Sequence, residues 1–249
     1  ATSLTGSLFM VTDKPEVYRT GLIDPARKSL PVLFTLPGQV FDLDPSRSAF
    51  LDRTTTEMSG SGERESDGSR TSPFDLFMLE LNMPWERWCV LGRLGEKEES
   101  ISLAELGLEK SKEYLLYEFW SDTFLGTVTN EVVFGRINPD YNCQLFCIRP
   151  VQQNPQVLAT SRHISCGATD LSDVGWENGI LTGKSQPVAN DPYTLLIFEP
   201  DGYKTPEITI TGGRIVSGTK TKQVRKITLE NSDGGPVIWS LDYSRSALN

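Results

Sequence analysis

From residue 74 to the C-terminus, short apolar segments alternate with turn residues at a spacing of roughly ten residues. The clearest segment is Tyr114–Trp120, which is dense in aromatic residues, and Tyr193–Phe198 is similar in length and character. Short strands bounded by Gly, Pro, Asn and Asp are typical of β-sandwiches. The sequence therefore predicts a mainly β fold with antiparallel sheets. The expected strands are 74–81, 88–92, 114–120, 128–134, 143–148, 157–160, 179–185, 193–198, 207–211, 224–229 and 237–241.

The chain is longer than the usual single domain, since its 249 residues exceed the common ~100–200. A polar, Gly- and Ser-rich stretch separates the first residues from the strand series, and Pro150–Pro155 divides that series in two. We expect four parts. They are a segment like the end of a (β/α)8 barrel at 1–50, a flexible linker at 51–73, a first β-sandwich module at 74–150 and a second at 156–249.

The N-terminal segment has a different pattern. Leu4–Val11 is expected to be a strand, and Asp24 and Pro25 are suited to the N-cap and first residue of a helix that ends before Pro31. One strand followed by one helix cannot bury its own apolar faces, so another part of the protein must pack against this segment. In a β/α barrel the carboxyl end of a strand faces the active site, which makes Asp13 and its neighbour Lys14 candidate substrate contacts.

Charge and composition exclude several classes of partner. The net charge is −9, and no basic stripe that could neutralise phosphates is present, so no nucleic-acid partner is expected. No apolar run approaches the ~20 residues that cross a bilayer, so no membrane partner is expected either. The four cysteines are too few for a disulfide scaffold; we expect buried free thiols and favour a reducing compartment. With one histidine, no CxxC pair and no phosphate-binding glycine motif, neither a metal nor a cofactor is expected.

The residues that could carry chemistry are few. His163 is the only histidine, and no G-x-S-x-G accompanies it, so a structural role is expected rather than a hydrolase triad. Aromatic rings stack on the apolar faces of sugars, and neighbouring polar groups bond the hydroxyls. On this basis Trp85, Trp120, Arg162 and His163 are candidate sugar contacts. Core packing is expected for about half of the large rings of the β region. These rings are Trp85, Trp88, Tyr114, Tyr117, Trp120, Trp176 and Tyr193.

Three stretches carry a family resemblance: Leu4–Tyr18, Leu103–Leu108 with Tyr114–Gly126, and Val157–His163. Together they resemble the melibiase-like, α-galactosidase clan of glycoside hydrolases. Leu4–Tyr18 is similar to the last barrel strand and the loop after it. Tyr114–Gly126, preceded by Leu103–Leu108, resembles the C-terminal antiparallel β domain of those enzymes. Val157–His163, together with Asp170-Leu171 and Asp191-Pro192-Tyr193, looks like a β module appended in bacterial relatives.

The resemblance implies a barrel upstream that hydrolyses a glycosidic bond with two aspartates on earlier strands. No position here matches their motifs, so no catalytic residue is assigned. The hypothesis is the C-terminal part of a glycoside hydrolase, whose β modules support the barrel and can bind carbohydrate. The barrel can be part of the same polypeptide or a separate chain. The alternative is a stand-alone carbohydrate-binding or structural β protein without catalysis.

Overall fold

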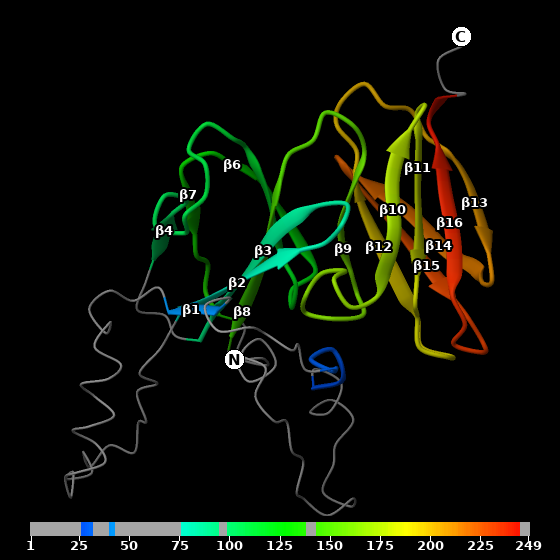
Figure 1. Cartoon of the computed structure of the whole chain (residues 1–249), viewed down its shortest axis with the longest axis horizontal. Coiled ribbons are helices and arrows are strands. Elements are labelled where there is room, and N and C mark those ends of the chain that lie inside the picture. The colour runs from blue at the N-terminus through cyan, green and yellow to red at the C-terminus, as the bar shows by residue number, and fades with distance from the viewer. Residues whose placement is uncertain (1–25, 32–39, 43–75, 95–98, 138–142, 245–249) are drawn as a thin grey trace, which may run out of the picture.

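The computed structural model describes residues 26–31, 40–42, 76–94, 99–137 and 143–244 (Figure 1). This part is mainly β, with several antiparallel sheets and almost no helix, as the sequence predicts. The strands are β1 Val40–Asp42, β2 Leu76–Asn82, β3 Arg87–Arg93, β4 Ser100–Ser102, β5 Tyr114–Glu118, β6 Thr123–Val128, β7 Glu131–Val133, β8 Gln144–Pro150, β9 Gln156–Thr160, β10 Leu171–Glu177, β11 Ile180–Ser185, β12 Tyr193–Phe198, β13 Glu207–Thr211, β14 Arg214–Thr221, β15 Val224–Glu230 and β16 Val237–Asp242.

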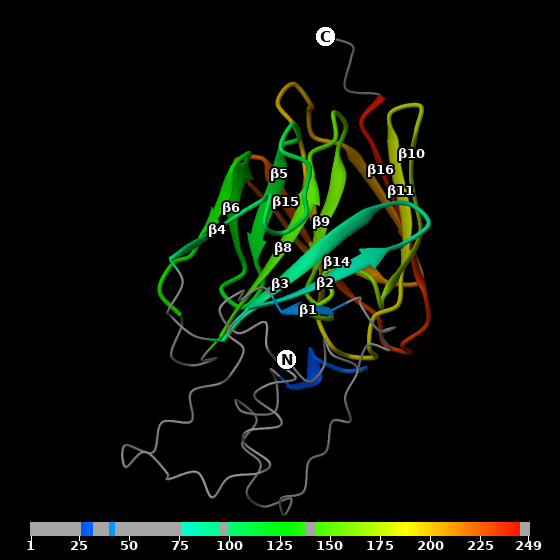
Figure 2. The same cartoon turned by 60° about the vertical axis from the view of Figure 1, so that its left-hand side comes forward.

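Three larger sheets form the body of the molecule. A six-stranded sheet has the order β1-β2-β3-β8-β5-β6, and an inner four-stranded sheet has the order β14-β15-β12-β9. An outer four-stranded sheet has the order β10-β11-β16-β13, and β4 and β7 form a small separate pair. In Figure 1 the six-stranded sheet lies on the left and the outer sheet on the right, and in Figure 2 the hairpin of β2 and β3 extends toward β10 and β11.

The inner sheet contributes to two hydrophobic clusters because successive residues of a strand point to opposite faces. On β12, Leu196 and Phe198 belong to a cluster shared with the six-stranded sheet, whereas Leu195 and Ile197 belong to one shared with the outer sheet. A third cluster covers the other face of the six-stranded sheet with β4, β7 and the turn at 103–108. β5, β8 and β9 are buried along nearly their whole length, which explains why their sequences are apolar without strict alternation.

Two local features connect sequence to geometry. Asn178 and Gly179 both have positive φ and join β10 to β11 in a two-residue hairpin, as their turn chemistry predicts. Gly183 on β11 lies directly opposite Trp239 on β16, and the indole occupies the space that a Cβ would need. A close ring approach in the outer sheet therefore requires glycine at position 183.

A buried ion pair of the first predicted β module lies at its junction with the second, and its arginine bonds across that junction. Arg149 on β8 is fully buried and its Nη1 lies 2.6 Å from Glu86 Oε2. The same guanidinium donates to the carbonyls of Leu158 at 2.9 Å and Cys166 at 2.7 Å. It also stacks over the Trp88 ring, with 3.8 Å between the guanidinium carbon and the ring centroid. The residues 74–150 and 156–249 thus share one polar anchor and one hydrophobic cluster.

The N-terminal expectations fall mostly outside the described residues. The strand at 4–11, the helix start at Asp24 and the linker at 51–73 all lie there. Residues 26–30 form one helical turn, in which Ser29 N–H donates to the Ala26 carbonyl at 3.0 Å. The division into four parts stays a prediction.

The cysteines are free thiols. Cys89, Cys147 and Cys166 are buried, as expected, whereas Cys143 is partly exposed. Burial is the main cause that raises the pKa of the Cys89 thiol far above its ordinary value.

Candidate functional site

Three consecutive residues after β9 hold the helical turn at 26–31 against the inner sheet. Arg162 Nη1 donates to the carbonyls of Arg27 and Leu30 at 3.3 and 3.2 Å. His163 Nε2 lies 3.0 Å from the Pro31 carbonyl, and the Ile164 amide donates to the Lys28 carbonyl at 2.9 Å. We call this set of backbone-directed bonds the 162–164 clamp.

An ion pair adds a side-chain contact to the clamp. Arg27 Nη2 lies 3.2 Å from Asp191, which precedes β12. Arg27, Asp191 and Arg162 also line a groove of about 370 Å³. Lys28 lies 5.5 Å from the centroid of the Phe119 ring, so the turn also reaches the end of β5. The segment at 26–31 therefore contacts both predicted β modules.

His163 is structural in this arrangement. The Ser165 amide donates to Nδ1 at 3.0 Å, which leaves Nε2 to carry the proton and donate to Pro31. Ser165 Oγ is 2.9 Å from Nδ1, but Ser165 and His163 are both fully buried, and a carbonyl occupies the place of the triad carboxylate. Burial lowers the pKa of His163 to about 4, although its bonds to the Ser29 and Pro31 backbone oppose this. The geometry gives no support to a hydrolase centred on His163.

Trp85 lies in the turn between β2 and β3 and faces the outer sheet. Together with Trp176 of β10 it lines a cavity of about 60 Å³, next to Gln152, Asn154 and Gln156. That volume holds a few water molecules, which is less than a sugar ring needs. The Trp85 Nε1 is buried and has no hydrogen-bond partner within the described part of the chain. Two tryptophans and several amides meet here, but the space between them is small.

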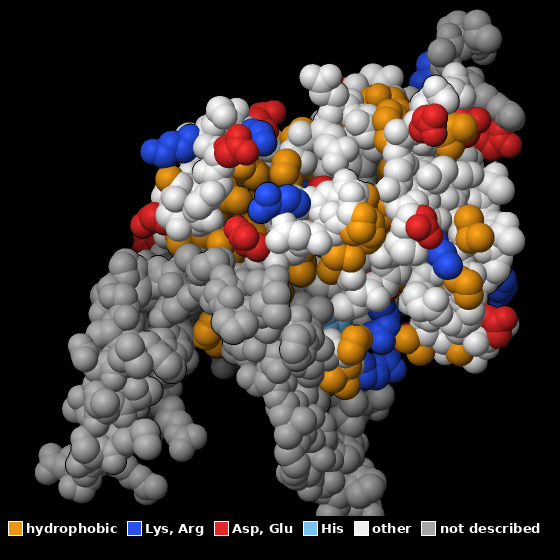
Figure 3. Space-filling view, viewed as in Figure 1, with side chains coloured by type: hydrophobic (Ala, Val, Ile, Leu, Met, Phe, Trp, Pro, Cys, Tyr) orange, Lys and Arg blue, Asp and Glu red, His pale blue; other side chains and the backbone are white. Residues whose placement is uncertain are grey.

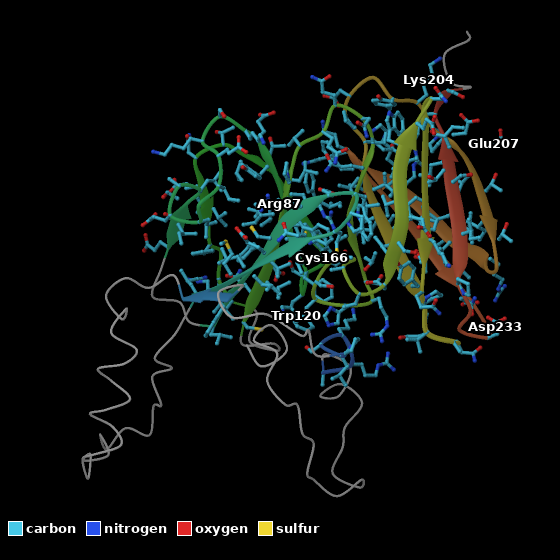
Figure 4. The ribbon with its side chains drawn as sticks, viewed as in Figure 1. Arg87, Trp120, Cys166, Lys204, Glu207 and Asp233 are labelled. Atoms are coloured by element: carbon cyan, nitrogen blue, oxygen red, sulfur yellow. The ribbon has the colours of Figure 1, made fainter. Side chains whose placement is uncertain are left out.

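Trp120 lies elsewhere, just after β5 (Figure 4). It packs edge-on against Phe119, with 5.2 Å between ring centroids and 84° between planes. It does not line the cavity beside Trp85. Asp13 and Lys14 lie outside the described residues. The cavity beside Trp85 and the groove beside Arg162 are each lined without Trp120, so neither brings the candidate residues together.

Four of the seven large rings considered from the sequence are core residues, namely Trp88, Tyr114, Tyr117 and Tyr193. Trp85, Trp120 and Trp176 are half-buried. The exposed large hydrophobic residues of the described chain are all aliphatic. Among the described residues, therefore, the large aromatic rings are buried or half-buried and none is fully exposed.

No group of three or more His, Cys, Asp or Glu side chains in residues 26–31, 76–94, 99–137 and 143–244 is placed to hold a metal ion. No helix in the described structure is long and apolar enough to cross a bilayer.

A comparison with models of protein families found no match, and neither did a search of curated proteins.

Proposed function

We propose that this chain is the C-terminal part of a glycoside hydrolase, in which two β-sandwich modules brace the end of a catalytic (β/α)8 barrel. The observation that carries the proposal is the 162–164 clamp. The segment it holds lies within 1–50, the part of the sequence that resembles a barrel end, and the clamp belongs to the appended module of the same resemblance.

The chemistry of the clamp suits a brace better than a catalytic site. Its bonds run to backbone carbonyls, which fix the path of a chain whatever its side chains are. His163 is uncharged at neutral pH because burial lowers its pKa to about 4, so it acts as a fixed donor. A fully buried donor with both ring nitrogens occupied holds a segment in place and does not exchange protons with substrate.

The alternative is a stand-alone carbohydrate-binding β protein. The half-buried Trp85 and Trp176 favour it, since both line one small cavity. The lack of an exposed aromatic ring among the described residues weighs against a binding face of the platform type. The bracing role therefore accounts for more of the described geometry.

The proposal is tested on the native polypeptide that carries this sequence. We expect it to be a larger chain, or a stable complex with a barrel-containing chain, that hydrolyses nitrophenyl α-galactoside or a related glycoside. Intact mass and an activity panel of nitrophenyl glycosides measure both properties. A 27.7 kDa monomer without glycosidase activity or an associated chain would overturn the proposal.

A further inference from the structure

A cavity of about 270 Å³ opens on the face of the six-stranded sheet that points away from the inner sheet. Its floor consists of Cys89, Tyr114 and Ile148, which belong to the cluster on that face. The turn at 103–113 forms one wall with Leu108, Glu109 and Lys112. In Figure 3, hydrophobic side chains over this sheet are flanked by basic and acidic ones.

The hairpin of β2 and β3 contributes polar side chains to the cavity lining. Glu80 and Asn82 lie two residues apart on β2, so they point to the same face, and Asn82 is paired directly with Arg87. These three side chains have neither a hydrogen bond nor an ion pair with another described residue. Within the described part of the chain, a carboxylate, an amide and a guanidinium without such bonds line the cavity, with Arg87 at the start of β3 (Figure 4).

Tyr114 provides a buried polar group at the same place. Its hydroxyl oxygen accepts the Glu109 amide at 3.0 Å, and the residue is only 4% exposed. The hydroxyl proton has no acceptor within the described residues. A buried donor without an acceptor costs stability unless water or a ligand supplies one.

The charges around the cavity balance. Glu109 pairs with Lys112 at 2.7 Å, and Glu80 and Arg87 contribute one charge of each sign. A balanced rim favours neither an anion nor a cation. Planar groups with both donors and acceptors, above an apolar floor, suit a neutral ligand with many hydroxyls and one apolar face. Ligand pockets usually measure ~300–1,000 Å³, so this volume suits a small ligand of one ring.

We infer that this cavity binds a single neutral pyranose, with Glu80, Asn82 and Arg87 bonding its hydroxyls, Ile148 beneath its C–H face and Leu108 beside it. The inference rests on the carbohydrate role of the proposed function and adds a binding site on the six-stranded sheet. Binding is measured on the intact chain and requires no hydrolysis. Its failure would therefore leave the bracing proposal untouched.

The test is NMR titration of the full chain with methyl glycosides of glucose, galactose and mannose. We expect at least one of these glycosides to shift the amide resonances of residues 80–89 and 107–112, with saturation at millimolar concentrations of the glycoside. Arg87→Ala and Asn82→Ala should each weaken binding about tenfold or more, because each removes hydrogen bonds to the sugar. Arg136→Ala is the matched control, since Arg136 is exposed and outside the cavity.

Four outcomes would overturn the inference. The first would be that none of the three sugars shifts these amide resonances saturably, and the second that the Arg87→Ala variant binds as well as the Arg136→Ala variant. The third would be that the shifts occur around Trp85 and Trp176 instead. The fourth would be tighter binding of glucuronate than of the neutral sugars, which would indicate an anion site.

Discussion

Replacing Arg149 with methionine is expected to lower the free energy of unfolding by about 3–5 kcal/mol, because the substitution removes one partner of a buried ion pair. Glu86 would keep a buried carboxylate without its cation, and burial already raises the pKa of that carboxyl despite Arg149. The carbonyls of Leu158 and Cys166 would each lose a donor, and the Trp88 ring would lose the cation stacked on it. Urea denaturation followed by tryptophan fluorescence measures the loss.

A double-mutant cycle separates the ion pair from the packing. Arg149→Met combined with Glu86→Leu should recover a large part of the loss, since a buried pair replaced by apolar groups is often close to neutral. Arg136→Ala, at an exposed position, should change stability by less than about 0.5 kcal/mol. A loss below about 1 kcal/mol in Arg149→Met would show that the junction does not depend on this anchor.

Acidification from pH 6.5 to 4 is expected to destabilise the protein through His163. The imidazole has an ordinary pKa of 6.5, and burial lowers it to about 4 in the folded state. Between these values the unfolded chain binds more protons than the folded one, so stability rises with pH. The contribution of the neutral His163 to the free energy of unfolding is complete above pH 6.5. It falls by up to about 1.4 kcal/mol per pH unit as the pH drops toward 4.

Carboxyl groups also respond to acid, so the measurement needs a reference. Burial works to raise the pKa of Glu199, but its bonds to Arg225, Lys220 and Tyr243 lower it overall, and the protein loses this stabilisation in acid too. His163→Gln keeps a polar side chain that does not titrate. The difference in unfolding free energy between wild type and this variant should shrink as the pH falls from 6.5 to 4. A difference that is constant with pH would contradict the buried, neutral histidine.

The strands that sequence patterns missed lie mainly at sheet edges. β6, β10 and β14 are terminal strands of the three larger sheets, and all eight residues of β14 are exposed. β6, β10 and β14 are exposed along much of their length, so they carry few of the apolar residues that identify a strand in a sequence, whereas β9, also terminal, is buried on both faces. The buried strands β5, β8, β9 and β12 were predicted because burial on both faces demands a dense apolar run.

The sites were harder to predict than the strands. Arg162 and His163 stood out in the sequence, but their partners are backbone carbonyls more than 130 positions earlier, and a carbonyl leaves no sequence signal. The cavity beside Arg87 depends on the register that pairs Asn82 with Arg87. Alternation along β2 indicates that Glu80 and Asn82 share a face, but it does not reveal the turn at 103–113 that closes the cavity.

The bracing role depends on the contact between residues 26–31 and the 162–164 clamp. The Ile164 amide reports on it directly, because its acceptor is the Lys28 carbonyl at 2.9 Å. Deleting residues 1–38 removes that acceptor and leaves the clamp itself intact. Hydrogen exchange of the Ile164 amide, measured by NMR in both proteins, should be at least about tenfold slower in the full chain. Equal protection in the two proteins would show that the segment is not held there, and would contradict the brace.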